Sequence, residues 1–498
     1  MKKTLTRLLH TLIAACAGAV IMGLSVFIWY LDSRDDLELW HTLELSEEFT
    51  ADSELAGFSD YLELEQRLFS ELDTEIYGRS DAESPSIVQR YDRDSLADPA
   101  RWDRNWNRSF ILGGPGAAQA VVLIHGMSDS PYSMRSIAEA YANRGAYVLG
   151  LRLPGHGTIP SGLVQLEVAD MRAAVHLAIA HAVERNPGAD LQLVGYSNGA
   201  ALALDYTLDS LTEPALVRPD RLVLLSPMIG ITRGAVLADW QAELGTFLGL
   251  DKLAWNDIML EYDPYKYNSF AINAAEVTYR LTIELQEKLA NLESSSSLSE
   301  MPPILAFSSA VDATVVMPVS ISALFNRLNG EHYELVLFDV NRLALDYKLL
   351  SVDPQQLLGP LEADSQRSFT LSIIANTTPN TSEVSWWRWL PGSTTPSQKV
   401  LNLAWPKETY SLSHIALPFP PHDRLYGATP PETGPDTIHL GKIAMRGERG
   451  VLRVPPGAML RQHWNPFHSW MINYILSEEA QLPLNTTPAN QVSAPVQN

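Results

Sequence analysis

Apolar residues follow two patterns that alternate along this chain from about residue 101 onward. Short apolar runs are typical of buried strands, and apolar residues three or four positions apart are typical of helices. The strand-like runs are Ala120–Ile124, Tyr147–Leu151, Leu191–Val194, Arg221–Leu225, Ile304–Phe307 and Glu334–Phe338. Helical patterns separate them at Pro131–Asn143, Ala169–Glu184, Gly199–Leu208 and Val319–Leu328. The alternation predicts an α/β fold with a mostly parallel central sheet and helices on both faces.

Two long intervals interrupt this alternation. Residues 228–301 have a mainly helical pattern with aromatic residues at Trp240, Phe247, Trp255 and Tyr262. Residues 340–412 carry strand-like runs at Phe369–Ile374 and Val400–Ala404 and a tryptophan cluster, which predicts an extra β-containing insertion. We therefore expect one large domain over 101–480 with two insertions. Residues 481–498 are rich in Pro, Thr, Asn and Gln, which predicts a disordered tail.

The N-terminus has a third pattern, a nearly continuous apolar run from Leu8 to Leu31 that follows Lys2, Lys3 and Arg7. Its length is sufficient for a membrane-crossing helix. Positive residues precede the run and acidic residues follow it, so the body is expected on the periplasmic or extracellular side. The sequence predicts a signal anchor, or transmembrane helix, over residues 1–31.

The single cysteine offers an alternative anchor. Ile13-Ala14-Ala15-Cys16 resembles a bacterial lipobox, in which the cysteine is lipidated. The apolar run continues well past Cys16, which a lipoprotein does not need. One cysteine excludes an intrachain disulfide, and no Cys/His group has the spacing of a metal site.

Charge is spread unevenly. The net charge of −22 argues against binding to nucleic acid, which needs a basic face. Between Asp32 and Glu83 there are 17 acidic residues and 3 arginines, which predicts a solvated, partly disordered stalk over 32–100. Within it Tyr61, Leu64, Leu68, Leu72 and Ile76 recur at helical spacing. Such a helix fits either packing on the body or an isolated position in the stalk.

The first chemical signal is Gly195-Tyr196-Ser197-Asn198-Gly199, between an apolar strand and an Ala/Leu-rich helix. A sharp strand-to-helix turn exposes a serine hydroxyl and needs small flanking residues. Acyl transfer also needs two N–H donors for the oxyanion. We predict Ser197 as the nucleophile, with Asn198 and Met127 as the two backbone donors. His125 ends a buried strand ahead of the serine, so we interpret it as structural.

The segments His125-Gly126, Arg152-Leu-Pro154-Gly155-His156-Gly157 and the Ser197 turn together resemble the α/β-hydrolase superfamily, and within it the esterase and monoacylglycerol-lipase-like serine hydrolases. The resemblance extends from about Ala120 to Asp312. It implies a catalytic triad in the chain order Ser, then Asp or Glu, then His, together with a covalent acyl-enzyme and no cofactor. It also implies that residues 228–301 form a helical cap and that the Arg152–Gly157 loop shapes the pocket rim.

The serine needs a histidine base, and the histidine needs a carboxylate. Asp312 follows the Ile304–Phe307 strand, where the family has its acid; Asp339 is the competitor. The family's histidine usually follows the last strand, expected here to end at Phe338, but no histidine stands there. We predict His414 as the base. The other histidines that satisfy the order are His422, His439, His463 and His468.

These features predict a membrane-anchored serine hydrolase of carboxylic esters, with a small-molecule ester or lipid as substrate. Two alternatives stay open: an amidase or peptidase that uses the same residues, and a non-catalytic envelope protein that keeps the fold as a binding module.

Overall fold

The computed structural model describes residues 2–79, 86–230, 251–312, 314, 317–343, 353–441 and 461–477. The predicted tail at 481–498 lies outside the described residues.

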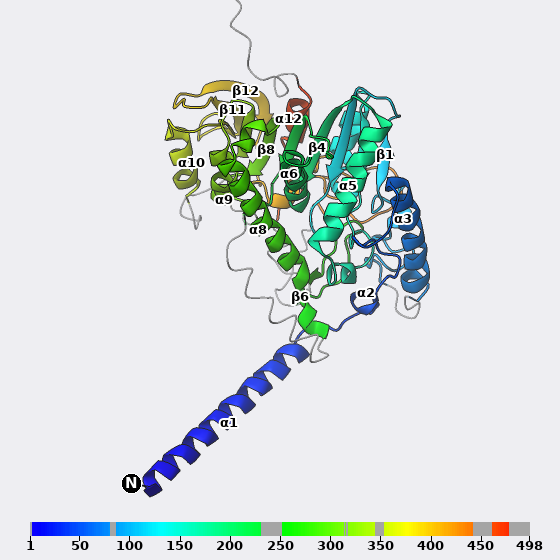
Figure 1. Cartoon of the computed structure of the whole chain (residues 1–498), viewed down its shortest axis with the longest axis vertical. Coiled ribbons are helices and arrows are strands. Elements are labelled where there is room, and N and C mark those ends of the chain that lie inside the picture. The colour runs from blue at the N-terminus through cyan, green and yellow to red at the C-terminus, as the bar shows by residue number, and fades with distance from the viewer. Residues whose placement is uncertain are drawn as a thin grey trace, which may run out of the picture.

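A single large sheet organises the body (Figure 1). Its ten strands lie in the order β1-β3-β2-β4-β5-β8-β9-β10-β11-β12. Their bounds are β1 Phe110–Leu112, β2 Gln119–Ile124, β3 Tyr147–Leu151, β4 Asp190–Tyr196, β5 Arg221–Leu225, β8 Ile304–Ser309, β9 Tyr333–Phe338, β10 Thr370–Asn376, β11 Glu383–Trp389 and β12 Ser397–Ala404. The neighbours from β3 to β10 pair in parallel, and β1, β11 and β12 pair antiparallel at the two edges. The predicted mostly parallel sheet is confirmed.

Alternate residues of each strand enter two separate cores. In β2, Val122 and Ile124 join a core with α5 (Val168–Arg185), α6 (Asn198–Ser210) and α8 (Ile272–Ser294). Val121 and Leu123 join the opposite core with α4 (Arg135–Ala142) and α12 (His468–Ile475). Because successive side chains of a strand point to opposite faces, this division puts helices on both faces of the sheet.

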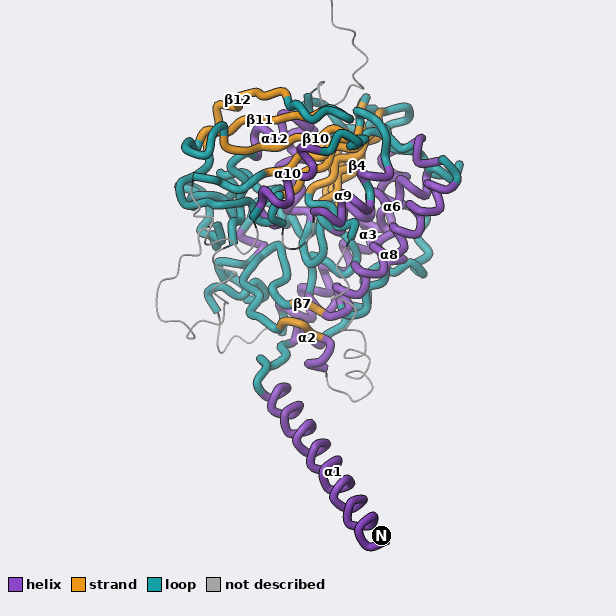
Figure 2. Tube along the Cα trace, turned by 90° about the vertical axis from the view of Figure 1, so that its left-hand side faces the viewer, coloured by secondary structure: helices purple, strands orange, loops and turns teal. Residues whose placement is uncertain are grey.

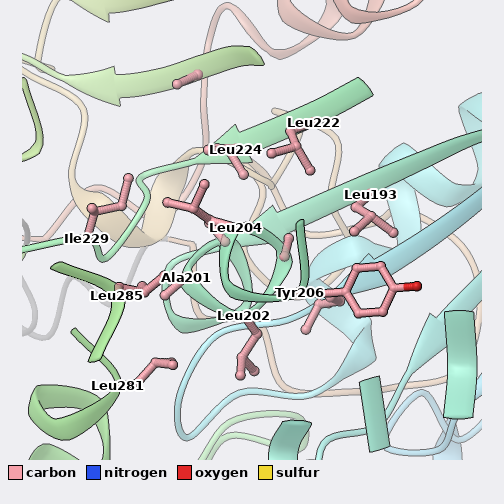
Figure 3. Packing of buried hydrophobic residues seen from close by; sticks show 14 of the residues in the cluster. Leu193, Ala201, Leu202, Leu204, Tyr206, Leu222, Leu224, Ile229, Leu281 and Leu285 are labelled. Carbon is pink, nitrogen blue, oxygen red and sulfur yellow. The ribbon is translucent and has the colours of Figure 1, made fainter. Parts of the chain in front are cut away.

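Helix α8 corrects the expectation for residues 228–301. Its side chains Leu281 and Leu285 pack toward Leu202 and Leu204 of α6 in the first core (Figure 3). The last third of the predicted cap is therefore a helix that flanks the sheet. Before it, β6 (Trp255–Asp257) and β7 (Phe270–Ala271) form a two-stranded ribbon. Trp240 and Phe247 of the predicted cap lie outside the described residues.

The interval 340–412 is an extension of the main sheet, and the expectation that the last strand ends at Phe338 is wrong. Strand β10 pairs in parallel with β9, and β11 and β12 continue outward as an antiparallel pair. Every residue of β10 is buried. The run at Phe369–Ile374 was readable as a strand, but its pairing partner depends on long-range packing that local pattern does not encode.

The acidic segment is also different from the prediction, since its described residues are folded onto the body. Helix α3 (Phe58–Leu72) buries Tyr61, Leu64, Leu68 and Leu72. Of the two readings of this helix, packing on the body is confirmed. Two acidic side chains of this segment, Glu48 and Glu65, form ion pairs with Arg152 of the body. The negative charge of the segment is therefore compatible with packing on the body and does not require a solvated stalk.

At the N-terminus, α1 (Lys2–Asp32) extends away from the body (Figures 1 and 2). Within the described residues, one helix, His10–Asp32, is long and apolar enough to cross a membrane, with a mean hydropathy of 2.3. Just beyond this helix, the Arg34 guanidinium donates to the carbonyl oxygens of Lys252 and Asn256, at 2.8 and 2.9 Å. The helix is thus joined to the segment that contains β6.

Candidate active site

Ser197 occupies the sharp turn between β4 and α6, with φ 55° and ψ −116°. A non-glycine residue in this conformation costs about 1–3 kcal/mol, so the surrounding contacts must hold it. The turn is very tight: a Cβ on Gly195 would lie 2.4 Å from Ala200 Cα, and one on Gly199 would lie 2.1 Å from Ile124 O. The two glycines of the motif are therefore required by close backbone approach.

Hydrogen bonds to strand β5 and the chain after it hold the strained serine. Ser197 N–H donates to Leu225 O at 2.9 Å, and Met228 N–H donates to Ser197 O at 3.2 Å. The side chain is left at the end of the sheet, where parallel strands commonly present reactive groups.

The structure brings His414 to Ser197 and Asp312. His414 Nε2 lies 3.0 Å from Ser197 Oγ, and His414 Nδ1 lies 2.8 Å from Asp312 Oδ2. An ionised carboxylate only accepts hydrogen bonds, so Nδ1 carries the proton and Nε2 is free to accept from the serine hydroxyl. Asp312 Oδ1 accepts from Thr314 N–H at 2.8 Å, which fixes the carboxylate orientation. His414 and Asp312 are both buried.

The competing acid lies elsewhere. Asp339 is fully buried and pairs with Arg342 at 2.8 Å. Burial raises the pKa of its carboxyl group, and the neighbouring Arg342 opposes that shift. Asp339 therefore forms an ion pair at the start of the loop after β9, whereas Asp312 is the carboxylate that contacts His414.

The competing histidines are likewise in other environments. His422 is exposed, and His463 stacks on Tyr426 with ring centroids 5.9 Å apart. Burial lowers the pKa of His463 to about 4. His468 begins α12, and burial lowers its pKa to about 3.

The two N–H donors predicted from the sequence, Met127 and Asn198, come from two different segments of the chain. Met127 lines the same cavity as Ser197, and Asn198 is the first residue of α6. In the described part of the chain neither backbone N–H is assigned an acceptor. The first N–H groups of a helix lack intrahelical partners, so Asn198 N–H is available to an anion beside Ser197.

His125 has a structural environment. Its Nε2 accepts from Leu153 N–H at 3.0 Å, and its Nδ1 lies 2.8 Å from Gly126 O. The loop from Arg152 to Gly157 was expected at the pocket rim, but none of its residues lines the Ser197 cavity. Instead, the buried Arg152 guanidinium pairs with Glu48 at 2.9 Å and with Glu65 at 3.3 Å. This loop binds the acidic N-terminal segment.

A cavity of about 430 Å³ lies over Ser197. Its lining includes Met127, His414, Asp257, Phe270 and two cationic side chains, Lys266 and Arg461. Sequence reasoning missed both cations, since neither belongs to a motif. Close to Lys266 the sequence has Asp263-Pro264, which is typical of a turn. A turn signal does not show in which direction the Lys266 side chain points.

Chemically, this arrangement allows a serine hydroxyl to lose its proton to an oriented imidazole as it attacks a carbonyl carbon. Within the described ranges, no group of three or more His, Cys, Asp or Glu residues could hold a metal ion.

Comparison with known proteins agrees with this geometry. Residues 115–340 match the family described as serine aminopeptidase, S33. A thermostable monoacylglycerol lipase from Bacillus sp. (strain H-257) is 31% identical over 130 residues, which are 26% of this chain. The match spans about half of that relative, 51% of its length.

Solved structures include a soluble variant of monoglyceride lipase from Saccharomyces cerevisiae, at 12% identity and a TM-score of 0.35, covering 46% of this chain and 82% of that one. A monoacylglycerol lipase from Paleococcus ferrophilus matches at 18% identity and a TM-score of 0.35, covering 46% and 88%. Residues 115–340, which contain Ser197 and the strands from β2 to β9, are therefore similar to the serine hydrolases of the α/β-hydrolase superfamily, in sequence as well as in sheet topology.

Proposed function

We propose that this protein is a membrane-anchored serine hydrolase that cleaves carboxylic esters through an acyl-enzyme. The observation that carries the proposal is the continuous contact from Ser197 Oγ to His414 and from His414 to Asp312 at the floor of a cavity. Hydrogen-bond distances of this kind between nucleophile, base and acid are what nucleophilic catalysis by serine requires.

In the first half of the reaction, Ser197 Oγ attacks the ester carbonyl carbon while His414 Nε2 accepts the hydroxyl proton. Met127 N–H and Asn198 N–H donate to the resulting oxyanion, which stabilises it by several kcal/mol. The tetrahedral intermediate then collapses. The alcohol leaves with the proton from His414, and the acyl group stays on Ser197. Asp312 holds the imidazole orientation and stabilises its protonated form.

In the second half, water attacks the acyl-enzyme carbonyl and gives its proton to His414. Collapse returns the proton to Ser197 Oγ and releases the carboxylic acid. Every proton is returned, so the cycle needs no cofactor.

The matched family's description raises a second candidate, an aminopeptidase. Such an enzyme must bind the positively charged α-amino group of a peptide, which calls for carboxylates beside the nucleophile. Among the described lining residues only Asp257 is acidic, whereas Lys266 and Arg461 are cationic. The charge around Ser197 therefore favours an ester hydrolase.

The test compares 4-nitrophenyl butyrate, 4-nitrobutyranilide and alanine 4-nitroanilide with the full-length protein. The proposal predicts Ser197-dependent turnover of the ester, with the two amides at least about 10²-fold slower in kcat/KM. Faster turnover of alanine 4-nitroanilide would favour the aminopeptidase. No turnover of any of the three by a folded protein would favour the non-catalytic binding module.

The proposed anchor is α1, with the body on the periplasmic or extracellular side. The Arg34 and Lys252 contacts join this helix to the β6 segment, and Asp257 of β6 lines the cavity. A lipid-like ester at the membrane surface would then lie close to Ser197.

Extraction of membranes with alkaline carbonate tests the anchor. We expect the full chain to stay with the membrane and a chain beginning at residue 33 to be released. Intact-mass spectrometry separates the two kinds of anchor, since a protein with a transmembrane helix keeps residues 1–15 and a lipoprotein would begin at a lipidated Cys16. Protease added to intact cells or spheroplasts should digest the body, and protection of the body would contradict the proposed side.

A further inference from the structure

The cavity over Ser197 carries an excess of positive charge, although the chain as a whole has a net charge of −22. Lys266 and Arg461 both line the cavity, and Asp257 is the one acidic lining residue among those described. In so acidic a protein, cations gathered at one concave site suggest that the site attracts an anion.

The loop that presents Lys266 is built rigidly. The Asp263 carboxylate accepts from the backbone N–H groups of Tyr265 and Lys266, at 2.9 and 3.1 Å. Buried Glu261 accepts from Asn268 N–H at 2.9 Å and from Ser269 N–H at 2.7 Å. These bonds fix the backbone on both sides of the lysine, so its position is set before any ligand arrives.

Aromatic contacts hold the same loop against the body. Tyr265 stacks on Tyr132 with ring centroids 4.4 Å apart. Tyr267 N–H donates to Ser128 O at 2.8 Å, and Tyr267 Oη donates to Gly155 O at 3.1 Å. Ser128 is also a lining residue, adjacent to Met127. The lysine loop is thus joined directly to the loop that carries one proposed oxyanion donor.

Lys266 itself is half-buried, and no described residue accepts a hydrogen bond from its Nζ or forms an ion pair with it. The nearby carboxylates are engaged elsewhere: Asp263 also accepts from Tyr426 Oη, and Asp129 accepts from Ser130 N–H at 2.8 Å. Burial lowers the pKa of the Lys266 amine, while the negative charges of Asp129 and Asp263 favour its protonated form. The donors of Lys266 Nζ are therefore left for a ligand, and an anionic group that accepts from them would restore hydrogen bonds lost on burial.

Arg461 stands close to the acid of the proposed triad. Its Nη2 donates to Thr314 Oγ1 at 3.1 Å, and Thr314 N–H donates to Asp312 Oδ1. A guanidinium has five donors in a fixed fork, so one bond to Thr314 leaves donors for a carboxylate or phosphate. The exposed arginine and the half-buried lysine thus come from distant parts of the chain to one cavity.

We propose that Lys266 and Arg461 bind an anionic group, a carboxylate or a phosphate, carried by the ester that Ser197 cleaves. This inference rests on the proposed function and narrows its substrate class to acidic esters. Lys266 and Arg461 act here as binding residues, and the covalent steps are unchanged.

Two matched substrate pairs test the proposal and separate the two sources of negative charge. The first pair is 4-nitrophenyl butyrate and the mono-4-nitrophenyl ester of glutarate, which adds a carboxylate on the acyl side. The second pair is 1-butyrylglycerol and its 3-phosphate, which adds a phosphate on the alcohol side. Each is assayed with the wild type, Lys266→Met, Lys266→Arg and Arg461→Met. Lys407→Met, an exposed lysine away from the cavity, is the matched control.

For at least one pair, the wild type is expected to prefer the anionic member in kcat/KM. Loss of one charge-assisted hydrogen bond in Lys266→Met or Arg461→Met should lower that preference about tenfold. Lys266→Arg and Lys407→Met should keep the preference, and added salt should weaken it.

A wild type without anionic preference in either pair overturns the inference, as does an equal loss on both members of the pair that shows the preference. Ester hydrolysis is left intact by both outcomes. Absence of Ser197-dependent turnover on all four substrates overturns the proposed function and this inference with it. If Lys266→Met fails to fold, the test rests on Arg461→Met, which changes an exposed residue, and on the salt dependence of the wild type. An anionic preference that neither Arg461→Met nor added salt weakens would contradict the inference.

Discussion

The imidazole of His414 reaches to 3.0 Å from Ser197 Oγ, although 217 residues separate the two in the chain. The chain leaves the site after β9, builds β10 to β12 and then returns. Asn341, just beyond β9, marks the point of return: its N–H donates to Tyr410 O at 2.7 Å, and its Nδ2 donates to Thr409 O at 2.9 Å. These hydrogen bonds join the two ends of the segment that contains β10 to β12, and His414 lies four residues after Tyr410.

Asn341→Ala should therefore disturb the base without touching substrate. Asn341→Ala removes the bonds from Nδ2 of this buried residue to Thr409 O and to Pro406 O, at 2.9 and 3.4 Å, in the returning segment. The loss is expected to lower kcat by about 10- to 100-fold, because small misplacements of a catalytic group are costly. Steady-state ester hydrolysis measures this, with KM nearly unchanged. Ser393→Ala, in the exposed β11–β12 turn of the same extension, is the control and should retain wild-type kcat. An unaltered kcat in Asn341→Ala would show that His414 is positioned by other contacts.

Replacing the proposed base should abolish most turnover. His414→Ala is expected to lower kcat for 4-nitrophenyl butyrate by about 10³-fold, since general base catalysis contributes on this scale. His463→Ala, which removes a ring stacked on Tyr426, should keep kcat within about threefold. Comparable losses in the two variants would contradict the assignment of His414.

The ion pair between Arg152 and the acidic segment makes a prediction about stability. Arg152→Met leaves Glu65, which is 3% exposed, without its cation. Breaking a buried pair in this way costs about 3–5 kcal/mol of unfolding free energy. Urea denaturation measures it. The control is Arg67→Met, whose partner Glu47 is exposed, and its expected cost is at most about 1 kcal/mol. A loss in Arg152→Met no larger than in this control would mean that the acidic segment is only loosely attached.

Buried histidines make stability depend on pH. Burial lowers the pKa of His468 from its ordinary 6.5 to about 3. The folded chain therefore holds fewer protons than the unfolded chain in this window, so the contribution is full above pH 6.5 and is lost as the pH falls toward 3. His468→Gln should flatten the pH profile of unfolding free energy by up to about 1.4 kcal/mol per pH unit.

Other buried groups change the stability with pH in the opposite direction. The quantity to compare is therefore the difference in unfolding free energy between the wild type and His468→Gln. Burial raises the pKa of Glu261 to about 7, and its contribution is lost as the pH rises from its ordinary 4.5 toward 7. This term is common to the wild type and His468→Gln and cancels in their difference. Parallel profiles for the two proteins between pH 4 and 6.5 would contradict a neutral, buried His468.

Local pattern sufficed for the central part of the fold. The strands at Tyr147–Leu151 and Arg221–Leu225 have the predicted bounds, because continuous apolar runs between turn signals leave few alternatives. The turn at Ser197 was predictable because close backbone approach demands Gly195 and Gly199. These features depend on a few neighbouring residues.

What the sequence did not reveal depends on distant contacts. Whether β10 extends the sheet is decided by pairing with β9, and the role of Asn341 by the return of the chain at Tyr410. The acidic segment looked solvated because charge alone does not show that Arg152 lies buried beside Glu48 and Glu65. Lys266 belonged to no motif, and only the folded loop places it over Ser197.

The most direct measurement of the central claim is labelling of the full-length protein by a fluorophosphonate probe, which reacts with an activated serine. We predict stoichiometric labelling of the wild type, located on the peptide that contains Ser197, and none of a folded Ser197→Ala variant. A folded wild type that resists the probe would contradict the account of an activated serine. Labelling that persists in Ser197→Ala would show that the reactive residue lies elsewhere.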